Sequence, residues 1–271
     1  MLARPTFAGG AATGYTPVTA VTAADWAVVG ALYDGLTDVD PDDAAARPRP
    51  AVTEGWKHDG GSTWLFRVRP GLTFSDGSPV LASSFADAWD AAASPDNTAA
   101  DAELFRLISG GEERRRGEAT HIAGVSFDDD LRLFTVSLTA PFPDFPALVA
   151  HPIFSPVSAT GAAGNGPFVL EGPPGGDGTV GLVRNPEWNG GDYDGELRLP
   201  ARPFLDRLVL AAPGDTVTVG AEVTTLVPGR AGPSSGPGPA TRREVLTSYY
   251  LAFDGDDPAV GGTGSAPLRQ A

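Results

Sequence analysis

The stretch TWLFRVRPGLTFSDGSPV, residues 63–80, constrains the fold of this chain more than any other part of its sequence. Its first half alternates between two kinds of residue, which predicts a β-strand with one buried face. The apolar face carries three alternate residues, Trp64, Phe66 and Val68. The opposite face carries Arg67 and Arg69, and the Pro-Gly pair at 70–71 ends the strand. We therefore expect one side of this strand to lie on a core and the other side in solvent.

A tight turn and a helix are predicted to follow this strand. Asp76 and Gly77 have the composition of a turn, and Pro79 stops any further strand. Ser83 or Ser84 is expected to cap the helix. The predicted buried face of that helix has four residues at helical spacing, Phe85, Ala88, Trp89 and Ala92. Nothing in this strand, turn and helix has the chemistry of a site, so we interpret the corner as scaffold.

The rest of the chain alternates between helical and strand patterns. Helices are predicted over three further segments, 22–36, 101–109 and 145–150. A hairpin is predicted from 121–126 and 131–138, around the aspartates at 128–130. Strands of a second sheet are predicted over four segments, 164–170, 180–183, 205–211 and 245–253. These elements together predict an α/β fold, with mixed sheets covered by helices.

The charge balance excludes one large class of function. The chain of 271 residues has 19 Lys and Arg against 34 Asp and Glu, a formal net charge of −15. Such a charge repels phosphate backbones and anionic membrane surfaces, so we expect no nucleic-acid partner. The acidic residues are interpreted as a solubilising surface.

The chain has no cysteine, which excludes disulfides, thiolate metal sites and a lipid-bearing cysteine in this sequence. No apolar run approaches the roughly 18 residues of a membrane span. The first residues, MLARPTFAGG, lack the apolar segment of a secretion signal. We therefore expect either a cytoplasmic protein or one whose export segment is absent from this chain.

Three patterns resemble sites without meeting their requirements. GPSSG at 232–236 matches a hydrolase nucleophile pattern, but Pro and Gly replace the strand and helix that this turn needs. DVDPDD at 38–43 resembles the start of a calcium loop, but Asp43 stands where glycine is needed and Arg49 where glutamate is needed. The three histidines, His58, His121 and His151, lack metal-ligand spacing. We predict no catalytic residue, no metal site and no cofactor.

Six segments occur in an order that carries a resemblance. They are LYDGL at 32–36, EGW at 54–56, the stretch at 63–89, NGPFVL at 165–170, VRNPEW at 183–188 and FLDRLVL at 204–210. In this order they resemble the oligopeptide-binding branch of the extracytoplasmic solute-binding proteins of ABC importers, the dipeptide, oligopeptide and nickel class called family 5. SYYLAFDGDDPAV at 248–260 resembles the family's strand before the crossover to a second lobe.

The resemblance implies a periplasmic-binding-protein-like fold of type II, cluster C. Residues 1–42 and 159–271 would form the hinge-proximal part of the first lobe, and residues 43–158 an inserted α/β subdomain. The second lobe would be missing from this chain. GAEVTTLVPG at 220–229 is expected to keep a trace of a family helix.

By analogy with the family, one wall of the ligand cleft would come from this lobe. The residues expected in this wall are Val21, Asp25, Trp26, Phe105, Asn165, Gly166, Tyr249 and Tyr250. Core packing is the alternative interpretation for each aromatic residue among them. The carboxylate that the family offers to a peptide's N-terminus would lie in the missing lobe, so it is assigned to no residue here.

The function implied by the resemblance is capture of a peptide-like solute by hinge closure and its delivery to the membrane permease of an ABC importer. This implies an extracytoplasmic protein that is not an enzyme and has no direct insertion into the membrane. An alternative is the ligand-sensing domain of an intracellular, cytoplasmic transcription regulator, which the lack of a signal peptide suits. A hydrolase is a third alternative without positive support. The sequence does not identify the ligand.

Overall fold

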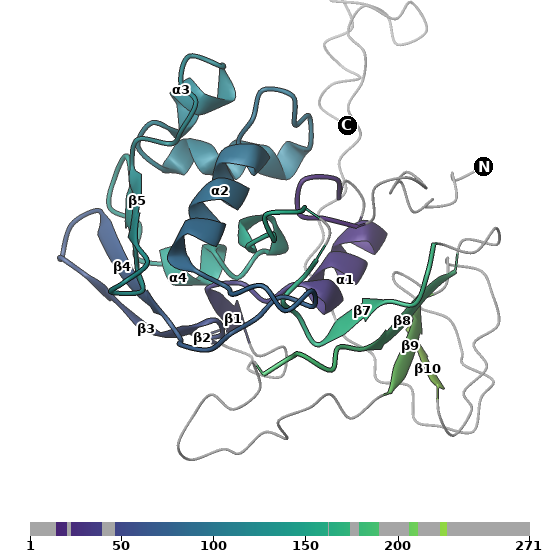
Figure 1. Ribbon diagram of the computed structural model, residues 1–271. Coiled ribbons are helices and arrows are strands. Elements are labelled where there is room, and N and C mark those ends of the chain that lie inside the picture. The colour runs from purple at the N-terminus through teal and green to yellow at the C-terminus, as the bar shows by residue number, and fades with distance from the viewer. Residues whose placement is uncertain are drawn as a thin grey trace, which may run out of the picture. The chain divides into compact units, whose positions relative to one another are not determined.

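The computed structural model describes residues 15–20, 23–39, 47–161, 163–173, 179–189, 206–210 and 223–226. Figure 1 shows helices and strands interspersed along this part of the chain, as the α/β prediction requires. Its α-helices are α1 (Ala23–Leu32), α2 (Ala82–Ala92), α3 (Gly111–Arg115) and α4 (Phe145–Leu148). Two 3₁₀ helices, η1 (Ala100–Leu107) and η2 (Pro152–Phe154), lie among them.

The strands among the described residues form two four-stranded sheets and one short pair. The first sheet has the order β3-β4-β6-β5, from β3 (Thr53–His58), β4 (Thr63–Val68), β5 (Val125–Asp128) and β6 (Leu133–Ser137). The second sheet has the order β10-β9-β8-β7, from β7 (Phe168–Leu170), β8 (Val180–Arg184), β9 (Arg207–Leu210) and β10 (Val223–Leu226). The pair consists of β1 (Thr37–Val39) and β2 (Pro48–Pro50).

Strand β4 has the two faces that its sequence predicts. Trp64, Phe66 and Val68 are buried, with no more than 4% of any of them exposed, whereas Arg67 is exposed. The strand pairs antiparallel with β3 on one side and β6 on the other, so Phe66 lies opposite Phe134. Helix α2 packs on the apolar face and brings the rings of Phe85 and Trp89 against Phe134 (Figure 1). The predicted strand and the predicted buried helix face are confirmed.

The turn between β4 and α2 is built by Asp76 and Gly77. Gly77 has φ of +80°, a conformation that side chains disfavour, so glycine is required there. Asp76 Oδ1 accepts hydrogen bonds from the Ser78 hydroxyl and from the Ser78 backbone N–H, the latter at 3.0 Å. These bonds hold the pKa of the Asp76 carboxyl below its ordinary value.

The start of α2 differs from the prediction that Ser83 or Ser84 caps it. The N-cap residue is Leu81, which has no side chain that can accept a hydrogen bond. Ser84 Oγ accepts from the Leu81 N–H at 3.2 Å, and the Ser83 N–H donates to Asp129 Oδ1 at 2.9 Å. The cap therefore comes from the β5–β6 hairpin, 46 residues further along the chain, and adds a favourable carboxylate to the helix N-terminus.

The buried apolar side chains that the structure describes form two clusters. The larger joins the first sheet to α2, η1 and η2, and the smaller joins α1 to the second sheet. In the smaller cluster, Val28 and Val29 of α1 lie with Val180, Leu182 and Leu208. Trp26 and Val157 are partly buried and pack against both clusters.

Strand β10 corrects a second prediction. Residues 223–226, expected to keep a trace of a helix, form a strand that pairs parallel with β9, Val223 opposite Arg207. The β-branched residues Val223, Thr224 and Thr225 favour an extended backbone, which explains the difference. The strand predicted at 245–253 lies outside the described residues. The division into residues 1–42 with 159–271 and an inserted 43–158 stays a prediction.

Candidate ligand-binding site

The side chain of Trp26 lies where three segments meet. It is partly exposed, and its indole Nε1–H donates a hydrogen bond to Asp101 Oδ2 at 2.9 Å. Its ring meets the His151 ring edge to face, with centroids 4.8 Å apart. Helix α1, the 3₁₀ helix η1 and the residue before η2 thus contribute one residue each to a group that we call the Trp26 cluster: Trp26, Asp101 and His151.

His151 is held as a neutral imidazole in this cluster. Its Nδ1 accepts a hydrogen bond from the Ile153 N–H at 3.3 Å, which leaves the proton of the neutral ring on Nε2. Burial lowers the pKa of His151, and the opposing attraction of the Asp101 carboxylate is the smaller effect. At neutral pH His151 therefore leaves the negative charge of Asp101 uncompensated.

Sequence reasoning found Trp26 and missed its two partners. Asp101 lies 75 residues from Trp26, and His151 lies in a different segment again. Neither belongs to a pattern with a chemical meaning, and the spacing of His151 excluded only a metal site. The fold alone brings the three residues together.

Phe105 is a core residue in this structure. None of its side chain is exposed, and its ring packs against Phe154 at 4.9 Å and Trp89 at 5.9 Å between centroids. Trp89 in turn donates its indole N–H to the Phe154 carbonyl at 2.8 Å. Phe105 therefore supports η1, and with it Asp101, from the inside.

Asn165 and Gly166 fasten the chain to the end of α1. Asn165 is buried; its Oδ1 accepts from the Asp34 N–H at 3.1 Å, and its Nδ2 donates to the Asp34 carbonyl at 3.0 Å. The Gly166 N–H donates to the Leu32 carbonyl at 2.8 Å. A Cβ on Gly166 would lie 2.5 Å from the Leu32 carbonyl carbon, so only glycine allows this approach. Asn165 uses its amide on the backbone and is available for a ligand only if these bonds open.

Asp34, which Asn165 binds, is also bonded to the motif VRNPEW at 183–188. Its carboxylate accepts a hydrogen bond from Trp188 Nε1 at 2.7 Å, and Asn185 Nδ2 donates to the Gly166 carbonyl at 2.9 Å. Burial raises the pKa of Asp34 to about 6, and the Trp188 hydrogen bond opposes this shift only in part. The segments LYDGL, NGPFVL and VRNPEW are thus one hydrogen-bonded unit.

The remaining predicted wall residues divide into two groups. Asp25 is fully buried in the first turn of α1. The pKa of Tyr15 is raised to about 12, mainly by burial of Tyr15 and to a smaller extent by the negative charge of Asp25. Val21, Tyr249 and Tyr250 lie outside the described residues. Their contact with a ligand, like that of Trp26, stays a prediction.

The patterns that resembled metal and hydrolase sites gain no support. Asp38 pairs with Arg49, its Oδ2 accepting from Nη2 at 2.6 Å, and GPSSG lies outside the described residues. His58 Nδ1 accepts from the Gly60 N–H, and His121 Nδ1 lies 2.6 Å from Asp90 Oδ2. Within the described ranges, no three His, Asp or Glu side chains lie close enough to hold a metal ion.

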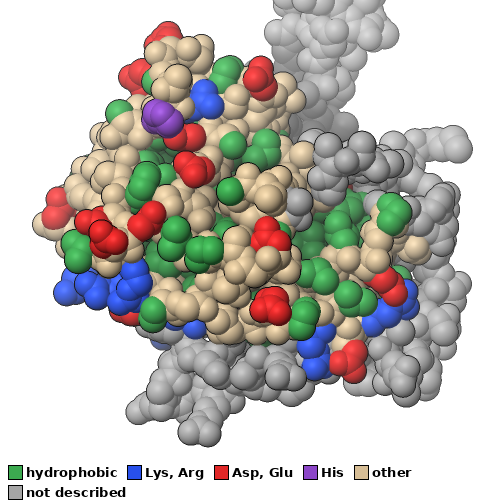
Figure 2. Space-filling model, in the orientation of Figure 1, with side chains coloured by type: hydrophobic (Ala, Val, Ile, Leu, Met, Phe, Trp, Pro, Cys, Tyr) green, Lys and Arg blue, Asp and Glu red, His purple; other side chains and the backbone are tan. Residues whose placement is uncertain are grey.

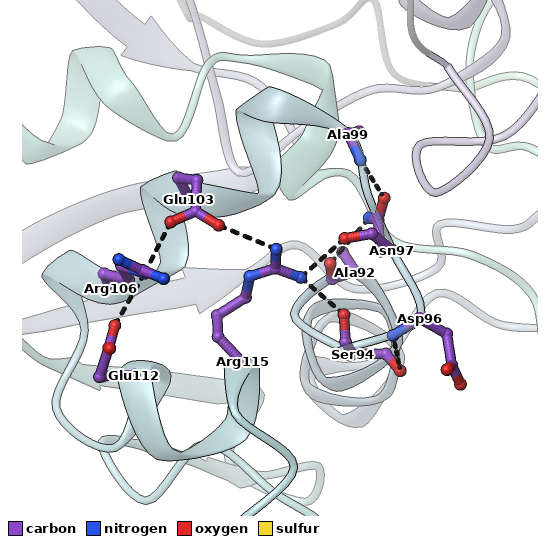
Figure 3. A network of polar contacts seen from close by, with 9 residues as sticks. All are labelled: Ala92, Ser94, Asp96, Asn97, Ala99, Glu103, Arg106, Glu112 and Arg115. Carbon is purple, nitrogen blue, oxygen red and sulfur yellow. Dashed lines mark hydrogen bonds and ion pairs between the residues drawn. The ribbon is translucent and has the colours of Figure 1, made fainter. Parts of the chain in front are cut away.

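Figure 3 shows how the other charges near η1 are neutralised. Arg115 donates to the Ser94 carbonyl at 2.6 Å, the Asn97 carbonyl at 2.8 Å and Glu103 Oε1 at 2.9 Å. Arg106 lies 2.7 Å from both Glu103 Oε2 and Glu112 Oε2. The arginines beside η1 are therefore occupied by glutamates and do not reach Asp101.

The described residues also line a cavity of about 380 Å³. It opens between Val18 and the segment after α2, and Asp96 and Arg114 contribute opposite charges to its lining. None of the predicted wall residues lines it. On the face shown in Figure 2, acidic side chains are scattered and the basic ones gather in small groups, with no extended basic surface.

The described residues form a mixed α/β scaffold with two apolar cores, and three sequence motifs are hydrogen-bonded together at the end of α1. Residues 47–219 match the family model described as bacterial extracellular solute-binding proteins, family 5 Middle. The chain belongs to this family.

Relatives of known name agree with this assignment. The periplasmic oligopeptide-binding protein OppA of Escherichia coli (strain K12) is 33% identical over 129 residues, which are 46% of this chain and 23% of OppA. The dipeptide-binding protein DppE of Bacillus subtilis (strain 168) is 29% identical over 173 residues, 58% of this chain and 31% of DppE. The murein tripeptide-binding protein MppA of Escherichia coli has a similar structure, with a TM-score of 0.59 and 25% identity over 65% of this chain and 36% of MppA.

These matches confirm the predicted fold class and show how much of each relative the chain covers. The fold is the periplasmic-binding-protein-like α/β fold, and the chain spans less than a third of the length of the two curated relatives. The name of the Escherichia coli relative OppA places that protein in the periplasm. Within the part of this chain that the structure describes, the helices are too short or too polar to cross a membrane.

Proposed function

We propose that this chain captures a peptide-like solute outside the cytoplasm for import through the permease of an ABC transporter. The observation that supports this most is the family match over residues 47–219, together with relatives named for oligopeptide and dipeptide binding. In this proposal the protein binds and releases its solute and transforms nothing, in keeping with a family of binding proteins.

The proposed mechanism is closure about a hinge. An extended peptide would be held largely through its backbone, with its side chains in hydrated pockets. Residues 1–42 and 159–271 would carry the hinge, and 43–158 the inserted subdomain. In this proposal four residues contact the ligand: Trp26, Val21, Tyr249 and Tyr250. Four others have a supporting role in the wall and do not contact the ligand: Asp25, Phe105, Asn165 and Gly166.

Calorimetry of the 271-residue chain with a library of tri- to pentapeptides tests the solute class. We expect measurable binding weaker than about 1 µM, because a wall from one part of the family fold leaves much of the peptide backbone in water. Deoxycholate is titrated as the alternative ligand, because another relative, YgiS of Escherichia coli, is named a probable deoxycholate-binding protein. Binding of deoxycholate with no heat from any peptide would contradict a peptide-like solute.

A further inference from the structure

Asp101 of the Trp26 cluster is an acidic group without a cationic partner among the described residues. Asp101 Oδ2 accepts the Trp26 indole N–H at 2.9 Å, and Oδ1 has no hydrogen bond or ion pair with any described residue. Asp101 is partly exposed, as are Trp26 and His151. An ionised carboxylate in a half-buried setting is stabilised by an opposite charge.

The neighbouring residues do not supply that charge. Arg106 belongs to η1 and Arg115 to α3, and both are held by Glu103, with Glu112 as a further partner of Arg106 (Figure 3). His151 remains neutral, as its burial and its bond from the Ile153 N–H require. Glu103 and Asp101 thus differ sharply, although they share one short helix: the first is neutralised and the second is not.

Trp26 adds a second feature that selects for a cation. A partly exposed indole offers apolar area to the methylene stem of a lysine or arginine and an electron-rich face to its charged end. The hydrogen bond from Nε1 fixes the carboxylate at the edge of this ring. A negatively charged group at the same place would meet Asp101 with no compensating cation from the described part of the chain.

We infer that the Trp26 cluster is a specificity subsite for a cationic side chain, lysine or arginine, of the captured peptide. The inference rests on the proposed function, because it takes the wall that includes Trp26 as the ligand side of the lobe. Asp101 forms the ion pair, Trp26 packs along the aliphatic stem, and the neutral His151 closes one side of the subsite without repelling the cation.

The test follows the indole N–H signals of the 271-residue chain by ¹H–¹⁵N NMR, with the Trp26 signal identified by its loss in Trp26→Phe. The probes are blocked tripeptides, N-acetylated and C-amidated, so that only the central side chain differs: Ala-Lys-Ala, Ala-Nle-Ala with uncharged norleucine, and Ala-Glu-Ala. Unblocked Ala-Ala-Ala reports separately on a peptide's N-terminal ammonium. We expect the lysyl peptide to shift the Trp26 signal with an affinity about tenfold higher than the norleucine peptide, and the glutamyl peptide to bind most weakly.

Two variants separate the role of Asp101 from a general effect of charge. Asp101→Asn keeps an oxygen that can accept the Trp26 N–H, and we expect it to remove the preference for lysine over norleucine. Glu103→Gln changes the net charge equally on the same helix, and we expect it to keep the preference. The peptide comparison on the unmodified chain needs no variant, so a folding defect in Asp101→Asn does not prevent a decision.

Each outcome decides the inference. Equal affinities for the lysyl and norleucine peptides would overturn it and leave the proposed function intact. So would a lysine preference that survives Asp101→Asn, or an Asp101-dependent response to unblocked Ala-Ala-Ala alone. A Trp26 signal that responds to no peptide overturns it as well, and the peptide library of the preceding subsection then shows separately whether the proposed function also fails.

Discussion

The indole nitrogen of Trp188 donates a hydrogen bond to the carboxylate of Asp34 at 2.7 Å, although 154 residues separate the two in sequence. Asn165 binds the backbone N–H and carbonyl of the same aspartate, so side chains from two distant segments converge on Asp34. The end of α1, the approach to β7 and the turn after β8 are therefore joined at one residue. The consequences for stability can be measured in two ways.

The first prediction concerns pH. Burial raises the pKa of Asp34 to about 6, above the ordinary value of 3.8. The folded protein therefore binds this proton more tightly than the unfolded chain, so the associated stability is present below about pH 4 and is lost as the pH rises through 6. Asp34→Asn removes this titration and keeps an acceptor for the Trp188 N–H. Relative to the unmodified protein, we expect the variant to gain up to about 1–3 kcal/mol between pH 4 and pH 7.

Urea unfolding at pH 4, 5, 6 and 7 measures this difference, and Asp96→Asn at an exposed loop position is the control. Asp38 and Arg69 also act on Asp34, in opposite directions, so the same series in Asp38→Asn shows how much of the shift comes from neighbouring charge. A difference between Asp34→Asn and the unmodified protein that does not vary with pH would show that Asp34 keeps an ordinary pKa.

The second prediction concerns the glycine in the same unit. A methyl group on Gly166 would lie 2.5 Å from the Leu32 carbonyl carbon and 2.6 Å from the Tyr33 nitrogen, both backbone atoms that cannot move alone. We expect Gly166→Ala to lower the free energy of unfolding by about 2–3 kcal/mol or more. Gly172→Ala is the matched control, because a Cβ there meets no atom within 4 Å, and its effect should stay within about 0.5 kcal/mol. Equal effects of the two substitutions in urea unfolding would contradict the close approach.

Local patterns in the sequence were enough to predict β4, its buried face and helix α2. The alternation of Trp64, Phe66 and Val68 is a property of adjacent residues, and the strand keeps it because the core lies on one side only. The cap of α2 was not predictable, because Asp129 reaches it from another element. The distance from Asp129 to Ser83 depends on how the β5–β6 hairpin packs, which the residues around Ser83 do not encode.

The candidate site was even less predictable from local sequence patterns than the cap of α2. The sequence suggests Asn165 and Gly166 as wall residues, yet Asn165 binds the backbone of Asp34 just after α1, and the Gly166 N–H binds the Leu32 carbonyl at the end of α1. Asp101 was not singled out, because a lone aspartate at the start of a short helix has no distinguishing pattern. Its role follows from a neighbour 75 residues away and from the absence of a described cation beside it.

The third prediction tests the core beneath β4. Trp64 is 4% exposed, and its ring lies 4.8 Å from that of His58 and 6.1 Å from that of Phe145. We expect Trp64→Ala to cost about 3–5 kcal/mol of unfolding free energy, because it leaves a large cavity between sheet and helix. Arg67→Ala on the exposed face should cost about 0.5 kcal/mol or less. Chemical denaturation monitored by circular dichroism measures both, and a cost below about 1 kcal/mol for Trp64→Ala would mean that the faces of β4 are reversed.

The last prediction compares two neighbouring arginines of α3 and the loop that follows it. Arg115 is 10% exposed and donates to two backbone carbonyls, of Ser94 and Asn97, as well as to Glu103. Removing it leaves those carbonyls without this donor in a largely desolvated position, so we expect Arg115→Ala to cost about 2–4 kcal/mol. Arg116 also forms a short ion pair, to Glu112 at 2.6 Å, but is 59% exposed.

Solvent screens the Arg116 pair, and ordering two long side chains opposes it, so Arg116→Ala should cost about 0.5 kcal/mol or less. Both substitutions remove one positive charge from the same region, so a difference between them reports burial and backbone hydrogen bonding and not net charge. Arg115→Lys refines the comparison, because an ammonium keeps the charge but cannot reproduce the planar fork that reaches two carbonyls and a carboxylate at once. If urea unfolding gives equal costs for Arg115→Ala and Arg116→Ala, or full stability for Arg115→Lys, then the network in Figure 3 acts through charge alone.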